Sequence, residues 1–131
     1  MSDYSFYKDP SKRTLKPDLF SDTADSLAKR IDKADSKKNK RTQIRKFYDE
    51  VVRLNAQARS YPQDWDKILP MVNMIIARAA YAEGRKLVTE DFVEFLKESI
   101  RQVQEPQDLD VFANLFEAFM GFYKKCRPSE N

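Results

Sequence analysis

With 131 residues, the chain is long enough for one compact domain. It contains no His, one Cys and two Gly, which excludes imidazole-based nucleophilic catalysis, zinc sites of Cys and His, and glycine-rich phosphate loops. The formal net charge is only +3, but residues 1–62 carry 15 basic and 9 acidic side chains, and residues 63–131 carry 9 and 12. We therefore expect no enzyme, cofactor or metal, and the basic half is the first candidate for binding a polyanion.

Residues 1–17 contain two prolines and no helical period, which predicts a flexible or surface-docked N-terminal arm. Its aromatic residues Tyr4, Phe6 and Tyr7 are unusual for a solvated tail and are candidates for packing on a neighbouring surface. The arm does not resemble a signal peptide, and no apolar stretch is long enough to span a membrane. Together with the lone Cys126, these features predict a cytoplasmic protein without membrane contact.

From Asp18 onward, apolar residues recur every three or four positions, which is typical of helices. The pattern predicts an all-α, single-domain bundle of about five helices over residues 18–127, followed by a short tail at 128–131. The first two helices are expected at about 18–33 and, after an N-cap at Thr42, up to about 59. Their expected core residues are Phe20, Ala24, Leu27, Ala28, Ile31, Ile44, Phe47, Tyr48, Val51, Leu54 and Ala58.

The third expected helix carries its apolar residues between Ile68 and Ala80, with Gly84 as a C-cap candidate. Pro70 requires this helix either to begin there or to kink. A fourth helix is expected after an N-cap at Thr89, and a fifth from about 107 to 125, after a connection that starts at Pro106. No strand pattern is present.

The fifth helix is too apolar for a single buried stripe. Such a helix either lies at the centre of the bundle or uses part of its surface to meet another protein. On a helical wheel, one apolar face contains Phe112, Phe116, Phe119, Met120 and Tyr123. The second face contains Val111, Leu115 and Phe122, which are the candidate residues for a partner interface.

Acidic residues are plentiful, but their spacing does not indicate an active site. Glu94 and Glu98 share a helix face, yet a di-metal helical bundle also needs Glu-x-x-His motifs, which this chain lacks. Cys126 has neither a base nor a second Cys to support thiol chemistry. The sequence therefore predicts no catalytic and no metal-binding residue.

A dense group of basic residues occupies ten positions that contain no acid: Lys37, Lys38, Lys40, Arg41, Arg45 and Lys46. Arg45 and Lys46 each have an acid four residues later, a spacing that is typical of a solvated, salt-bridged helix face. The other four lack such an acid and are the better candidates for binding phosphate.

A second group lies along the third expected helix, where Arg78, Tyr81 and Arg85 share one strip. Arg and Tyr side chains together bind backbone phosphate and stack on bases or sugars. The strip can also be explained without a ligand, if Tyr81 covers an edge of the core and Arg78 pairs with Glu83 or with a neighbouring helix. Combined with the first group, the strip predicts salt-dependent nucleic-acid binding that tolerates many sequences.

Three segments, residues 43–51, 76–86 and 116–125, resemble in order and spacing the small subunit of the type III-A CRISPR effector, the Csm complex. Their distinctive motifs are Arg-Lys-Phe-Tyr-Asp-Glu from Arg45 and Ala-Tyr-Ala-x-Gly-Arg from Ala80. The resemblance spans residues 42–126 and does not cover the N-terminal arm. By this match, the positions expected to face RNA or a subunit interface are Arg45, Lys46, Arg78, Tyr81, Arg85 and Lys86.

The resemblance implies a helical bundle without nuclease activity, copies of which stack as an inner filament. The implied partners are CRISPR RNA, target RNA, the repeated backbone subunit that cuts the target, the large signature subunit and other copies of the chain. An alternative hypothesis is a helical protein-interaction adaptor whose basic segment binds an acidic protein surface. A DNA-binding helix-turn-helix module is a weaker alternative, because no short helix pair joined by a Gly-containing turn places the basic residues at the start of its second helix.

Overall fold

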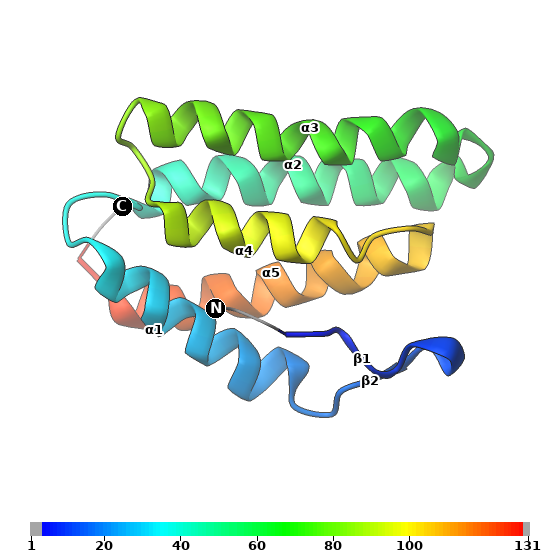
Figure 1. Ribbon diagram of the computed structural model, residues 1–131, viewed down its shortest axis with the longest axis horizontal. Coiled ribbons are helices and arrows are strands. Elements are labelled where there is room, and N and C mark those ends of the chain that lie inside the picture. Colours follow the sequence, from blue (N-terminus) through cyan, green and yellow to red (C-terminus); the bar gives the residue numbers. More distant parts are fainter. Residues whose placement is uncertain (1–3, 130–131) are drawn as a thin grey trace.

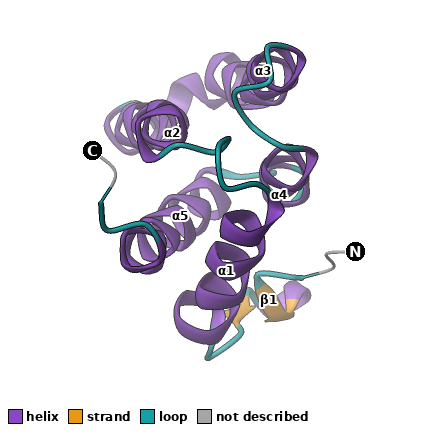
Figure 2. Ribbon diagram, turned by 90° about the vertical axis from the view of Figure 1, so that its left-hand side faces the viewer, coloured by secondary structure: helices purple, strands orange, loops and turns teal. Residues whose placement is uncertain are grey.

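Five α-helices make up the body of the computed structural model, which describes residues 4–129. They are α1 (Ala24–Ala34), α2 (Arg41–Ser60), α3 (Trp65–Gly84), α4 (Glu90–Ile100) and α5 (Pro106–Cys126). Seen along the bundle, α2 and α3 lie on one side, α4 and α5 in the middle, and α1 on the other side (Figures 1 and 2). The prediction of an all-α bundle of about five helices is confirmed.

The N-terminal arm forms a small antiparallel hairpin that the sequence pattern did not predict. Strand β1 (Tyr7–Asp9) pairs with β2 (Thr14–Leu15), and a short 3₁₀ turn (Pro10–Lys12) connects them. The two strands are only three and two residues long, too short to show an alternating pattern in sequence. The hairpin lies beside α1 in Figure 2.

From Tyr4 onward, the arm is docked on α4 rather than solvated. Phe6 is fully buried in the core. The Gln102 side chain accepts a hydrogen bond from the Phe6 N–H (2.8 Å) and donates one to the Tyr4 carbonyl (3.1 Å). The Tyr4 hydroxyl donates to the Phe95 carbonyl (3.1 Å) and also bonds Ser99. The aromatic residues of the arm therefore pack on a surface of their own chain.

The starts of α1 and α2 differ from the predictions. A single π-helical turn (Leu19–Thr23) precedes α1, and within it Leu19 is buried while Phe20 remains 37% exposed. The assignment of Phe20 to the core is therefore wrong. Helix α2 begins at Arg41 with Lys40 as its N-cap residue, so the N-cap prediction for Thr42 is also wrong.

Helix α3 runs from Trp65 through Pro70, so a start at Pro70 is excluded. Pro70 lies in the second turn, where the helix loses one backbone hydrogen bond. The helix ends in a Schellman motif, in which the Leu87 N–H donates to the Ala82 carbonyl (3.0 Å). Its left-handed residue is Lys86, with φ 64°, and the C-cap is Arg85. The C-cap prediction for Gly84 is therefore wrong.

Thr89 precedes α4 as predicted, but its hydroxyl does not cap the helix. Instead, Thr89 Oγ1 accepts a hydrogen bond from the side-chain amide of Asn39 (2.9 Å), and the Thr89 N–H donates to Asn39 Oδ1 (2.9 Å). The Asn39 N–H also donates to the Leu87 carbonyl (3.0 Å). These bonds fasten the α1–α2 loop to the α3–α4 loop.

Helix α5 starts at Pro106, so this residue opens the helix rather than a connection before it. Glu105 and Asp108 form a capping box that satisfies free backbone N–H groups at this end. Helices α4 and α5 meet through aromatic rings. The Phe95 ring lies within 6.3 Å, centroid to centroid, of the rings of Phe92, Phe112, Phe116 and Phe119.

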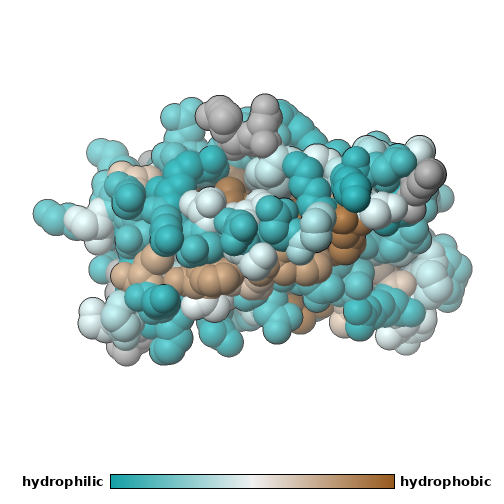
Figure 3. Space-filling view, turned by 90° about the horizontal axis from the view of Figure 1, so that it is seen from below, coloured by the Kyte–Doolittle hydropathy of each residue, from teal (hydrophilic) through white to brown (hydrophobic). Residues whose placement is uncertain are grey.

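The second apolar face of α5 is only partly at the surface. Leu115 is fully buried within the chain, so the prediction that it meets a partner is wrong for this packing, and the central position of α5 explains its apolar character. Val111 and Phe122 are half-buried. Figure 3 shows an apolar band on the side of the molecule opposite α3. Among the described helices, none combines the length and hydropathy that a bilayer span requires.

Candidate nucleic-acid interface

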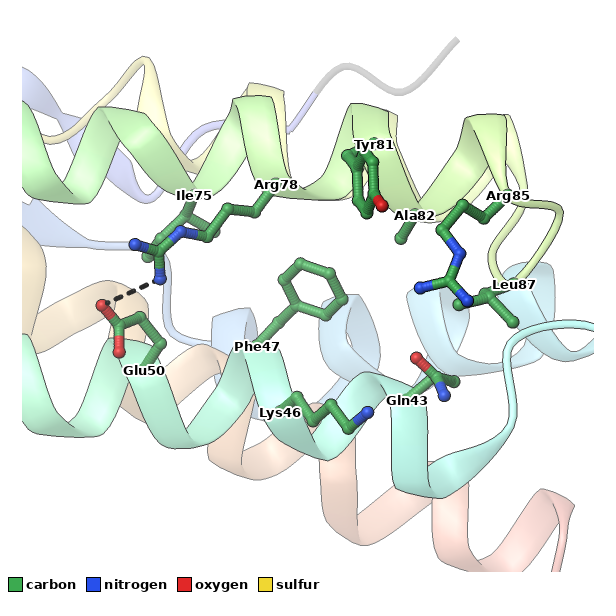
Figure 4. Close-up of a pocket in the computed structure, with 10 residues that line it drawn as sticks. All are labelled: Gln43, Lys46, Phe47, Glu50, Ile75, Arg78, Tyr81, Ala82, Arg85 and Leu87. Atoms are coloured by element: carbon green, nitrogen blue, oxygen red, sulfur yellow. Dashed lines mark ion pairs between the residues drawn. The ribbon is translucent and has the colours of Figure 1, made fainter.

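A groove with a volume of about 330 Å³ lies between α2 and α3 (Figure 4). In α2, the residues that line it follow helical spacing, so one face of the helix is turned toward α3. In α3, the lining residues occupy the last turns of the helix and the segment that follows. The full lining consists of Gln43, Lys46, Phe47, Glu50, Ile75, Arg78, Tyr81, Ala82, Arg85 and Leu87.

Three cations and one carboxylate define the charge of the groove. Arg78 lies 3.6 Å from a carboxylate oxygen of Glu50, and Arg53 lies 2.7 Å from the same oxygen. Within residues 4–129, neither Lys46 nor Arg85 has an ion-pair partner. The groove therefore carries more positive than negative charge, and its single carboxylate already has two arginine partners.

The pairing of Glu50 differs from the sequence expectation. The i,i+4 rule favoured a pair with Lys46, whereas Glu50 accepts two hydrogen bonds from Arg53, at 3.1 and 2.7 Å. The Arg53 hydrogen bond lowers the pKa of Glu50, and the charges of Arg53 and Arg78 act in the same direction. Glu50 is therefore ionised at neutral pH, and Arg78 pairs with a neighbouring helix, as one of the structural explanations proposed.

Two aromatic rings occupy the groove. Tyr81 is 69% exposed, so it does not cover a core edge. The Arg85 guanidinium carbon lies 5.8 Å from the centre of the Tyr81 ring, within cation–π range. Phe47 rises from α2 into the centre of the groove in Figure 4, and its ring meets that of Phe92 at 5.4 Å. The aromatic core of the bundle thus extends to this surface.

The basic loop before α2 lies at the same end of the bundle. The backbone N–H groups of Lys37 and Lys38 donate to Asp35 Oδ1 (2.7 and 3.0 Å), and these bonds lower the pKa of Asp35. The bond between Asn39 and Leu87 fixes the loop beside the segment that contains Lys86. The structure therefore brings together two basic segments that are more than thirty residues apart in sequence.

Two of the predicted residues point elsewhere. The Arg41 guanidinium donates a hydrogen bond to the Arg127 carbonyl (3.3 Å), which connects it to the end of α5. Arg45 lies about 200° around the helix from Gln43, on the side of α2 that faces away from the groove. The structure thus places Lys46, Arg78, Tyr81 and Arg85 in the groove, but neither Arg41 nor Arg45.

Gln43 and Phe47 line the groove although neither is among the candidate site residues predicted from sequence. Phe47 was assigned to the core, and it is indeed half-buried against it. Helical spacing from Lys46 and Glu50 contains the missing signal, because residues 43, 46, 47 and 50 share one face. Among residues 4–129, no cluster of three or more Cys, Asp or Glu side chains is arranged to hold a metal ion.

A comparison with protein families identifies the chain. The family model described as Csm2 Type III-A matches residues 14–129, which leaves only the first part of the arm and the end of the chain outside. No curated protein and no solved structure gives a significant match. Because the match covers almost the entire chain, this protein belongs to the Csm2 family and is a small subunit of the type III-A CRISPR complex.

Proposed function

We propose that this subunit is a non-catalytic scaffold that binds RNA in the groove between α2 and α3. Within the type III-A complex, it would help to hold the duplex of CRISPR RNA and target RNA. The observation that supports this most strongly is the meeting of Lys46, Arg78 and Arg85 around one groove whose single carboxylate is shared with Arg53. Such an excess of positive charge attracts a phosphate backbone.

The proposed contacts are to phosphate and sugar, and therefore tolerate any guide sequence. Lys46 and Arg85 are the primary phosphate ligands, because no ion pair engages them within the described part of the chain. Lys37, Lys38, Lys40 and Lys86 extend the same basic surface from the two adjoining loops. Binding through released counterions weakens steeply as salt rises.

The remaining proposed partners are proteins. Copies of the subunit would stack as an inner filament, beside the repeated backbone subunit and the large signature subunit. Val111 and Phe122 are candidates for such contacts, because both are half-buried apolar residues. Cleavage of the target belongs to another component in this proposal, since this chain has no His to act as a general base near neutral pH.

Charge reversal in the groove tests the proposal. The double substitution Lys46→Glu and Arg85→Glu should weaken binding to duplex and single-stranded RNA at least about tenfold, by replacing attraction with repulsion. The matched control is Lys67→Glu with Lys125→Glu, because both lysines are exposed and lie outside the groove. Affinities measured by filter binding should change little for the control.

Equal weakening by the two double variants would contradict a binding site in the groove. If the wild-type chain binds no RNA but co-purifies with an acidic protein, the adaptor alternative is correct. A further variant, Lys38→Glu with Lys40→Glu, tests whether the loop before α2 takes part. We expect a smaller loss of affinity than in the groove variant, because the loop lies beside the groove rather than in it.

A further inference from the structure

We infer that the groove between α2 and α3 receives one unpaired nucleobase of the bound RNA, which stacks on Tyr81. This inference rests on the proposed function, that the subunit binds RNA, and specifies which kind of nucleotide the groove accepts. Phosphate binding alone requires only cations. The aromatic and apolar parts of the groove need a separate explanation.

The Tyr81 ring lies at the surface, where a base can stack on it, rather than in the core. It is the most exposed of the large apolar side chains in the described part of the chain, at 69%. Its hydroxyl makes no hydrogen bond within residues 4–129. In Figure 4, the ring stands between Arg78 and Arg85 at the edge of the groove. A base that stacks on this ring would cover apolar surface that is now in water.

Arg85 favours the binding of a nucleotide at Tyr81 in two ways. Its guanidinium carbon lies 5.8 Å from the Tyr81 ring centre, so the cation already associates with the aromatic system. A guanidinium stacks on aromatic faces and also donates to phosphate, which places base and phosphate recognition on adjacent side chains. Lys46, on the opposite wall, supplies a second cation for the backbone of the same nucleotide.

The inner part of the groove suits a flat, partly polar ring. Its apolar lining comes from Phe47, Ile75, Ala82 and Leu87. A volume of about 330 Å³ is at the small end of the range for ligand pockets, which fits one base rather than a larger ligand. Gln43 adds a side-chain amide with both donor and acceptor groups, as the edge of a base requires.

A base in a continuous duplex cannot use this groove. Both of its faces are covered by neighbouring bases, and its pairing edge is occupied. A base in a single strand, loop or bulge has a free face and a free edge, and proteins read such bases by stacking them on aromatic side chains. The groove should therefore prefer RNA with an unpaired nucleotide over a perfect duplex.

The test compares two RNA duplexes that differ in one base. Both contain the same single-nucleotide bulge, but in one duplex the bulged nucleotide is abasic, so backbone and charge are identical. We expect the wild-type chain to bind the base-containing bulge about tenfold more tightly, because stacking on an aromatic side chain contributes this order of affinity. Salt concentration is held constant throughout.

Two substitutions separate stacking from charge. Tyr81→Leu should abolish the preference for the base-containing bulge, and Tyr81→Trp should retain it, because Trp also offers an aromatic face. The control is Tyr61→Leu, at the other strongly exposed Tyr, which is 55% exposed and lies outside the groove. Substitutions at such exposed positions usually change stability by less than about 0.5 kcal/mol.

A fluorescent base gives an independent readout. With 2-aminopurine at the bulge, its emission should fall on binding to the wild-type chain and to Tyr61→Leu, but not on binding to Tyr81→Leu. Equal affinity for the two bulges, or a preference that survives in Tyr81→Leu, would overturn the nucleobase site while leaving the phosphate-binding function intact. Absence of binding to both RNAs would overturn the proposed function itself.

Discussion

Asn39 illustrates how much of this fold depends on single residues in loops. It is fully buried and has a left-handed backbone, with φ 59°. Its side-chain amide donates hydrogen bonds to the carbonyl of Ile31 (3.2 Å) and to Thr89 Oγ1. Its backbone carbonyl accepts a hydrogen bond from the Tyr123 hydroxyl (2.6 Å). Asn is one of the few residue types that adopt this conformation readily and also offer such an amide.

Substitution of Asn39 should be among the most destabilising single changes in the chain. Asn39→Ala removes the amide bonds, leaves buried partners unsatisfied and forces Ala into a left-handed conformation, for a loss of about 3 kcal/mol in the free energy of unfolding. Asn39→Gly should cost about 1 kcal/mol less, because Gly adopts positive φ freely. Urea denaturation measures both. A larger loss of unfolding free energy in Asn39→Gly than in Asn39→Ala would contradict the claim that the left-handed backbone at this position penalises Ala.

The structural roles of single residues at helix ends and in loops were the hardest features to predict from the sequence. Lys86, rather than Gly84, is the left-handed residue after α3, because the Schellman bonds from Lys86 and Leu87 determine where the helix ends. Composition alone favours Gly at such a position. For the same reason, the part played by Asn39 in joining two loops is absent from any local pattern, since its hydrogen-bond partners are up to 88 residues away in sequence.

At the scale of elements, the N-terminal hairpin is fastened to the start of α5 by Asp108. This buried carboxylate accepts hydrogen bonds from the Tyr7 hydroxyl and the Arg13 guanidinium, and from the N–H groups of Gln104 and Glu105 (3.0 Å each). Burial would raise the pKa of Asp108, but the Tyr7 hydroxyl, the two N–H groups and the Arg13 charge together lower it. Burial and the adjacent carboxylate raise the pKa of Tyr7 to about 12.

Asp108 should therefore contribute stability that depends on pH. A carboxyl whose pKa is lowered by folding stabilises the protein fully above its unfolded pKa of about 3.9, and loses this contribution as pH falls through its folded pKa. At pH 7, Asp108→Asn should cost about 2 kcal/mol, because it exchanges charge-assisted hydrogen bonds for neutral ones. The difference between the two proteins should narrow as pH is lowered toward 3, as measured by thermal unfolding across pH.

The control for this experiment is Glu117→Gln, at an exposed carboxylate of the same helix. Its stability should follow that of the wild-type chain at every pH. A constant difference between Asp108→Asn and the wild-type chain from pH 7 to pH 3 would show that the ionised carboxylate is not what stabilises the hairpin.

Helices were easier to predict from sequence than the arm that covers them. The 3.6-residue period identified all five helices, because each buries a continuous apolar stripe. The hairpin was missed because its strands are short and its anchors, such as Gln102 and Asp108, lie about one hundred residues away in sequence. Leu115 was assigned to a partner surface because a wheel cannot distinguish a central helix from one with two interfaces.

In the molecule as a whole, the antiparallel packing of α2 and α3 explains why two basic segments that are distant in sequence lie at the same groove. Helix α2 begins where α3 ends, so Lys46 and Arg85 face each other across the groove although they are 39 residues apart. The sequence predicted both segments as RNA-binding candidates. Their position on opposite walls of one groove depends on how the two helices face each other, which sequence periodicity alone does not give.

The salt dependence of RNA binding is the sharpest test of whether Lys46 and Arg85 bind phosphate in the groove. For single-stranded RNA, each phosphate contact contributes about 0.7 to the slope of log K against log salt concentration. Lys46→Ala with Arg85→Ala should therefore make the slope less steep by about 1.4, whereas Lys67→Ala with Lys125→Ala should leave it unchanged. Identical slopes for the wild-type chain and the groove variant would show that Lys46 and Arg85 do not contact phosphate.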